Sequence, residues 1–178
     1  MKKTFSTKQL TTTALLLALC IIFQSLKGLS VYLTGSAVNC ILIIATLYCG
    51  ILSGTFIALV TPVVAYFIGA TPIMNMIPLM MPIIMLGNEL IVLCAWMFRK
   101  KLLPLGLAIG CIVKAGFLWL TVWYAVLPIF GANLKQPMIE VVKANFSLTQ
   151  LITACIGSII AWVIYKKGIK FYENIGNR

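Results

Sequence analysis

The sequence consists mainly of long apolar runs that are separated by short polar or glycine-containing segments. A helix rises 1.5 Å per residue, so it crosses a bilayer core of about 30 Å in about 20 residues. By this measure the pattern predicts an all-α, polytopic membrane protein with a single bundle of six transmembrane helices. The expected spans are about 10–26, 37–49, 51–69, 77–98, 102–127 and 146–165.

The second and third spans come from one apolar run, residues 37–68, which is too long for a single helix of bilayer length. Gly50 and Gly54 lie near its middle. Glycine weakens a helix because the unfolded backbone at that position has more freedom to lose. We therefore expect the chain to break within residues 49–54.

The basic residues provide a test of this division. With six spans and a cytoplasmic N-terminus, the outer side holds three of them, Lys27, Lys135 and Lys143. The inner side then holds ten: Lys2, Lys3, Lys8, Arg99, Lys100, Lys101, Lys166, Lys167, Lys170 and Arg178. One long helix at residues 37–68 would change the split to five against eight. Because cytoplasmic loops are enriched in Lys and Arg, the count predicts six spans with both termini in the cytoplasm.

Composition supports a chain that lies almost wholly in the membrane. It is 62% hydrophobic with a mean hydropathy of +1.08, so we expect one membrane domain over residues 1–178 and no soluble catalytic domain. The first run has the character of a signal peptide but lacks a clear cleavage site, and we expect it to be retained. The basic residues that give the net charge of +11 flank the spans. They indicate how the protein is oriented in the membrane and that it contacts anionic lipid rather than nucleic acid.

Several classes of chemistry are excluded by the residues that the sequence lacks. It contains no His, and its six cysteines stand singly within apolar runs without a CxxC motif. Ser-His-Asp and Cys-His catalysis therefore cannot occur, and we expect no metal site, no cofactor and no enzymatic activity. No P-loop is present, so the chain cannot drive transport by hydrolysing a nucleotide itself.

Two opposite charges, Glu89 and Lys114, lie inside the fourth and fifth apolar runs. A charge at the centre of a membrane helix costs about 2.5–3.5 kcal/mol on insertion scales, so such residues face a protein interior or a wet cavity and mark substrate or ion paths. The alternative is that the two residues pair with each other and only hold two helices together.

Polar and aromatic residues near these charges form a candidate binding site. Amide groups offer hydrogen bonds, and aromatic rings offer walls for a flat ligand. For Trp123 and Tyr124 the alternative is a place in the aromatic belt at the membrane interface. The candidate substrate-binding residues are Asn88, Glu89, Lys114, Trp119, Trp123, Tyr124, Asn145 and Gln150.

Three segments between the spans contain Gly, Pro or polar residues. Residues 28–36 and 128–144 are interpreted as lids over a cavity or as plain connecting loops. The third segment, residues 69–78, contains Pro72 and Pro78 and is followed by Pro82. Proline lacks an N–H donor, so we expect these residues to end or bend the helix there.

The first span contains Ala14 and Ala18, which lie four residues apart and share a helix face. Small residues at this spacing allow another helix to approach closely. That helix belongs either to a partner protein or to the same bundle.

In layout, the chain resembles the substrate-binding S components of energy-coupling factor (ECF) transporters. The resemblance rests on a small basic protein with six spans, on Ala14-xxx-Ala18, and on the Gly-rich segment 47–58, which is similar to the turn between helices 2 and 3 of that family. A proline-rich segment before helix 4 also occurs in the family.

The resemblance implies a membrane-embedded binder of a vitamin or similar micronutrient. Its partners would be a transmembrane T component, which would meet Ala14 and Ala18, and two cytosolic ATPases. The ligand would lie near the outer face among helices 4, 5 and 6 and the loop after helix 1. Two alternatives stay open, an ion-coupled secondary transporter that uses Glu89 and a membrane scaffold without transport activity.

Overall fold

The computed structural model describes residues 6–26, 28, 30–70 and 72–176, and within these ranges the chain is helical without strands. Six helices are long: α1 (Thr7–Ser25), α2 (Val31–Ile44), α3 (Ile51–Phe67), α5 (Met80–Phe98), α6 (Leu103–Thr121) and α9 (Leu148–Gly176). Three are short: α4 (Pro72–Met76), α7 (Leu127–Phe130) and α8 (Gln136–Asn145). π-helical turns at Ala45–Cys49 and Val122–Val126 extend α2 and α6.

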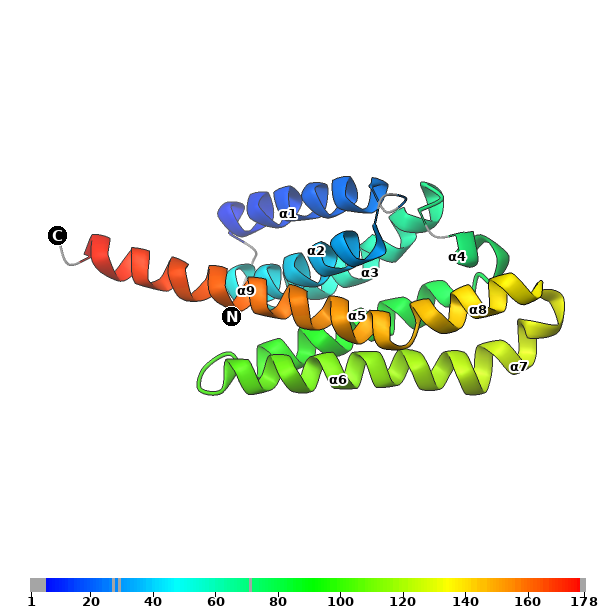
Figure 1. Ribbon diagram of the computed structural model, residues 1–178. Coiled ribbons are helices and arrows are strands. Elements are labelled where there is room, and N and C mark those ends of the chain that lie inside the picture. Colours follow the sequence, from blue (N-terminus) through cyan, green and yellow to red (C-terminus); the bar gives the residue numbers. More distant parts are fainter. Residues whose placement is uncertain (1–5, 27, 29, 71, 177–178) are drawn as a thin grey trace.

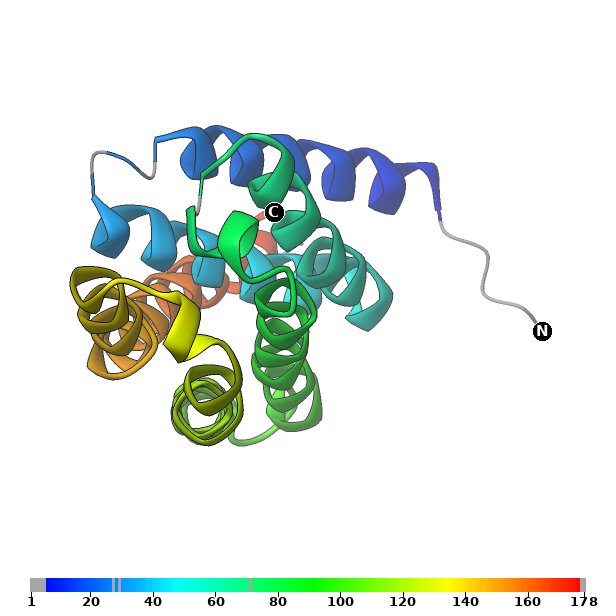
Figure 2. The ribbon, with the colours of Figure 1, turned by 90° about the vertical axis from the view of Figure 1, so that its right-hand side faces the viewer.

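The long helices form one bundle, with α2 packed on α9, α3 on α5, and α5 on α6. α1 lies along one side, against α2 and α3, and α6 lies on the opposite side (Figures 1 and 2). The short helices α4, α7 and α8 gather at one end of the bundle, and α9 extends past its neighbours at the other end (Figure 1).

The membrane prediction is confirmed at the level of an all-helical bundle. Five stretches are long and apolar enough to cross a membrane: Thr7–Ser25, Val31–Cys49, Met80–Phe98, Leu103–Phe130 and Gln136–Gly168. The sixth apolar helix, Ile51–Phe67, is shorter. Lys2, Lys3, Lys27 and Arg178, which contributed to the charge count, lie outside the described residues.

The expected break in the long apolar run is confirmed at Gly50. Its φ of 97° lies in the left-handed region that side chains with a Cβ rarely adopt. α3 begins at the next residue and ends at Phe67, before Gly69 (φ 66°). The proline-rich segment also interrupts the helix as expected, since α4 ends at Met76 and α5 starts only at Met80.

The predicted start of the second span, residue 37, was wrong. α2 begins at Val31 because Ser30 caps it, its side chain accepting a hydrogen bond from the Leu33 N–H at 3.3 Å. Residues 31–36, interpreted as part of a lid or loop, are therefore the first turns of a helix. Leu29 of that segment lies outside the described residues.

Residues 128–144 are likewise mainly helical rather than a loop. They contain most of α7, a 3-10 turn at Gly131–Asn133 and most of α8. α8 starts with Gln136-Pro137, where the missing N–H of proline costs no helical hydrogen bond. The helix of the last expected span continues beyond residue 165, because α9 reaches Gly176.

Buried apolar residues form two clusters that lie one above the other along the bundle. One cluster centres on α2 and includes Leu42, Ile57 and Ile91. The other gathers α4, α8 and the turns of α5 and α6 nearest to them, with Ile77 and Leu118 among its members. Along α5 and α6, the polar residues that form the candidate site lie between the two clusters.

Gly157 makes the close packing of α9 on α2 possible. A Cβ at this position would lie 2.5 Å from the Ser36 carbonyl oxygen and 2.9 Å from the Cys40 nitrogen. Both are backbone atoms of a helix, so neither can move aside locally. Gly116 on α6 differs, because a Cβ there would meet no atom within 4 Å.

We predict that Gly157→Ala lowers the free energy of unfolding by about 1–3 kcal/mol, the usual range for overpacking. The matched variant Gly116→Ala is expected to raise it by about 0.5–1 kcal/mol through helix propensity. Equilibrium unfolding of the purified protein in detergent measures both. Equal stability of the two variants would contradict the close contact between α2 and α9.

Candidate functional site

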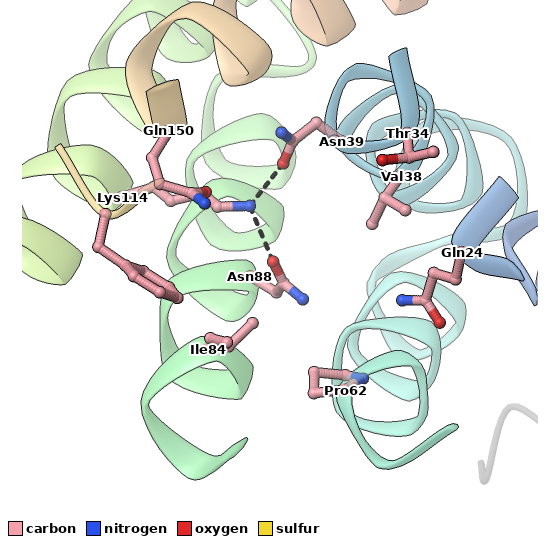
Figure 3. Close-up of a pocket in the computed structure, with 11 residues that line it drawn as sticks. Gln24, Thr34, Val38, Asn39, Pro62, Ile84, Asn88, Lys114 and Gln150 are labelled. Atoms are coloured by element: carbon pink, nitrogen blue, oxygen red, sulfur yellow. Dashed lines mark hydrogen bonds between the residues drawn. The ribbon is translucent and has the colours of Figure 1, made fainter. Parts of the chain in front are cut away.

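The centre of the site is the ammonium group of Lys114. Its side chain is 3% exposed and lies about 17 Å along α6 from the start of the helix at 1.5 Å per residue. Lys114 Nζ donates to Asn39 Oδ1 of α2 at 2.5 Å and to Asn88 Oδ1 of α5 at 2.8 Å (Figure 3). Both asparagines are also buried. Three helices therefore meet at one cation that two neutral amides hold.

A proline positions Asn88. Pro62 lies inside α3 and has no N–H, so the carbonyl of Ala58, four residues earlier, lacks its helical partner. Asn88 Nδ2 donates to this oxygen at 3.5 Å. The contact orients the Asn88 amide, whose Oδ1 then points at Lys114.

A cavity of about 90 Å³ opens beside Lys114. Its lining comes from α1, α2, α3, α5, α6 and α9 and is mixed, with amide, hydroxyl and apolar groups around one cation (Figure 3). Every described acidic residue lies outside it. The lining residues are Gln24, Thr34, Gly35, Val38, Asn39, Pro62, Ile84, Asn88, Lys114, Phe146 and Gln150.

Several polar groups of the lining remain available. An ammonium has three donors, and the described residues provide acceptors for two of those of Lys114. Across the cavity, Gln24 Oε1 is buried without a hydrogen-bond partner among the described residues. Since buried polar groups are normally paired, these groups indicate a site for a polar ligand.

A second space, of about 400 Å³, adjoins this cavity and shares Phe146 and Gln150 with it. Its other walls come mainly from α8, with Met138 and Val141, and from Ile73 of α4. This second space is called the outer space because its walls come mainly from α4 and α8 at the end of the bundle. It is more apolar than the cavity beside Lys114, which is called the inner cavity. The two spaces thus lie side by side, with Phe146 and Gln150 between them.

In the structure Glu89 does not line the cavity beside Lys114 and forms no ion pair with that residue. Glu89 Oε1 accepts a hydrogen bond from Thr55 Oγ1 of α3 at 2.8 Å, while its Oε2 is buried without a partner among the described residues. Within the part of the chain that the structure describes, the one ion pair joins Lys143 and Glu140. Consecutive residues of a helix point about 100° apart, so Asn88 faces the cavity and Glu89 does not.

The aromatic residues also lie outside the cavity. Trp119 and Trp123 are each 39% exposed and Tyr124 is 74% exposed. Trp119 contacts both of the others, with ring centroids 6.1 and 6.2 Å apart. The proposed ligand walls thus form a partly exposed cluster outside the cavity, which agrees with the alternative of an interface belt.

The remaining predicted residues fall in three places. Gln150 lines both spaces, and Asn145 lines the outer one, where its carbonyl accepts from Gln150 Nε2 at 3.1 Å. Ala14 and Ala18 are exposed on α1. The described part of the bundle covers neither of them. The structure therefore does not support the alternative that these alanines pack against another helix of the same bundle.

Sequence reasoning missed Gln24, Thr34, Asn39 and Pro62 as members of the site. A signal was present for two of them, since Asn39 carries the only side-chain amide of residues 37–68 and Gln24 lies within the first apolar run. A buried amide in a membrane span needs a partner for the same reason as a charge does. Pro62 acts through the backbone bond that it removes, and no pattern in the sequence indicates which side chain replaces that bond.

Comparison with known families decides the class of protein. The family model for the ECF transporter substrate-specific component matches residues 8–172. The chain belongs to this family. No curated protein and no solved structure matches it.

As an S component, the chain is a membrane-embedded transport subunit rather than an enzyme. Family membership implies association with a T component and ATPases in the cell membrane. The observed cavity beside Lys114 agrees with a role in substrate binding.

We predict strong energetic coupling between Asn39 and Lys114. Asn39→Leu alone should lower the free energy of unfolding by about 3–5 kcal/mol, because it leaves a buried charge short of a partner. In a Lys114→Met background the same change should cost less than about 1 kcal/mol, since no charge then needs the amide. A double-mutant cycle of unfolding in detergent measures the difference; additive effects within about 0.5 kcal/mol would contradict the contact.

Proposed function

We propose that this S component captures a vitamin or related small micronutrient in the cavity beside Lys114 and delivers it for ECF-type import. The observation that supports the proposal most directly is the buried ammonium group with one unused donor at a cavity wall. Intramembrane cations of this kind mark substrate paths. The site residues proposed are Gln24, Asn39, Asn88, Lys114, Phe146 and Gln150, with Asn145 in the outer space.

The proposed orientation places the cavity at the outer side of the membrane. The described basic residues near the α4–α8 end are Lys135 and Lys143, whereas Lys8, Arg99–Lys101 and Lys166–Lys167 lie toward the other end. The positive-inside rule assigns the richer end to the cytoplasm. Residues 1–178 would then form one membrane domain with six spans and both termini inside, and the substrate would enter from outside.

The proposed T-component surface is the exposed face of α1 with Ala14 and Ala18. α1 is held to the bundle by a buried hydrogen bond from Thr13 Oγ1 to Ser53 Oγ of α3 at 2.8 Å. Its opposite face is free for a partner helix, and alanines four residues apart let that helix approach closely. Because the chain has no P-loop, the ATPase partners must supply the energy.

We predict that Ala14→Trp or Ala18→Trp lowers energised uptake more than about tenfold, since a loss of 1.4 kcal/mol at the interface already reduces affinity tenfold. Retention of the co-purifying small molecule by the isolated protein should not change. Ile112→Trp, on the exposed face of α6, is the matched control and should leave both unchanged. Loss of uptake and retention together would assign the alanines to internal packing.

A second prediction separates the S component from a secondary transporter that uses Glu89. Because Glu89 lies outside the cavity, Glu89→Gln should preserve retention of the small molecule within about twofold, a change of less than 0.5 kcal/mol. Uptake should require co-expressed T component and ATPases. Uptake that runs on an ion gradient without these partners, and that is lost in Glu89→Gln, would instead support the secondary transporter.

The scaffold alternative makes the opposite prediction for binding. A protein whose polar centre only holds helices together has no reason to retain a small molecule. Mass spectrometry of the purified protein is therefore the first experiment, with Lys114→Met compared directly.

A further inference from the structure

We infer that the substrate is a small organic monoanion, such as a carboxylate, whose charged group binds Lys114 and whose less polar body points toward α8. This inference rests on the proposed function, because it specifies the ligand of the same cavity. It is carried by three features of the site: the sign of its charge, its unpaired amide and the shape of the two joined spaces.

The charge of the cavity has one sign. Lys114 is the only ionisable residue among the lining residues, and the described carboxylates of Glu89 and Glu140 lie elsewhere, on Thr55 and on Lys143. Two amide oxygens offset the ammonium only by their dipoles. An anionic group at the third donor would neutralise a buried charge that has no counter-ion among the described residues. A zwitterion would bring a second cation into a cavity without a carboxylate.

The far wall requires a second polar group on the ligand. Gln24 lies opposite Lys114 with its Nε2 turned toward the cavity (Figure 3), and its Oε1 has no partner within the described part of the chain. A primary amide can present either its oxygen or its nitrogen by rotating. The ligand therefore carries a hydrogen-bonding group on the side away from its anionic group. A purely hydrocarbon acid would leave Gln24 unpaired.

The joined spaces orient this ligand. The inner cavity, about 90 Å³, is smaller than the roughly 300–1,000 Å³ of typical ligand sites, so it holds only the polar part. The outer space of about 400 Å³ is lined largely by apolar side chains, including Ile73, Met138 and Val141. The body of the molecule consequently extends past Phe146 and Gln150, which line both spaces.

The test compares acids with uncharged analogues of the same shape. The full chain is purified in detergent, its retained small molecule is identified by mass spectrometry, and the emptied protein is titrated with three pairs: nicotinate and nicotinamide, pantothenate and panthenol, biotin and biotinamide. We expect the retained molecule to be an organic acid. In any pair that binds, the acid should bind at least about tenfold more tightly, equivalent to 1.4 kcal/mol.

Variants assign the preference to Lys114. Lys114→Met should abolish the preference for the acid, whereas Lys143→Met, on α8, should retain it. If Lys114→Met fails to fold, the comparison of acid and analogue on the unmodified chain still decides. A retained molecule that is neutral or cationic, or equal affinity within the pairs, overturns the anion inference and leaves the proposed function intact. No retained molecule and no binding in any pair overturns the proposed function as well.

Discussion

The fold depends on satisfying one buried ammonium group. Lys114 Nζ is held by Asn39 and Asn88, so that α2, α5 and α6 are joined at a polar point between two apolar clusters. In a membrane the hydrophobic effect does not discriminate between helix and lipid contacts, and polar contacts and close packing then determine how helices associate. The same contacts leave one donor of Lys114 for the cavity. Helix packing and the proposed ligand recognition consequently share a single residue.

The sequence was sufficient for the features that depend on backbone propensity and hydropathy. The apolar runs predicted the membrane helices, and the glycines in the over-long run predicted the break between α2 and α3, where Gly50 has a positive φ. The helix at residues 31–36 was missed, since Ser30 and polar neighbours look like a loop and capping is a local event. α8 was missed for a similar reason, as its amphipathic pattern is too short to be read as a span.

The site was predictable only in part because side-chain direction decides it. Asn88, Lys114 and Gln150 were identified from polarity within apolar runs, and all three line the cavity. Glu89 carries the same signal as Asn88 but points away, toward Thr55. The aromatic residues near Lys114 in sequence occupy another face of α6. Because the Glu89 carboxylate lies outside the cavity, the expected ligand also changes. It would face the Lys114 cation alone rather than both charges.

The most direct test of the account is an experimental structure of the purified protein with its retained small molecule. We expect ligand density in the cavity between α1, α2, α5 and α9, with an acceptor atom within about 3 Å of Lys114 Nζ, a normal hydrogen-bond distance. Asn39 and Asn88 should keep their contacts with the same ammonium. A ligand bound elsewhere, with Lys114 fully enclosed by protein groups, would show that this residue only holds the helices together.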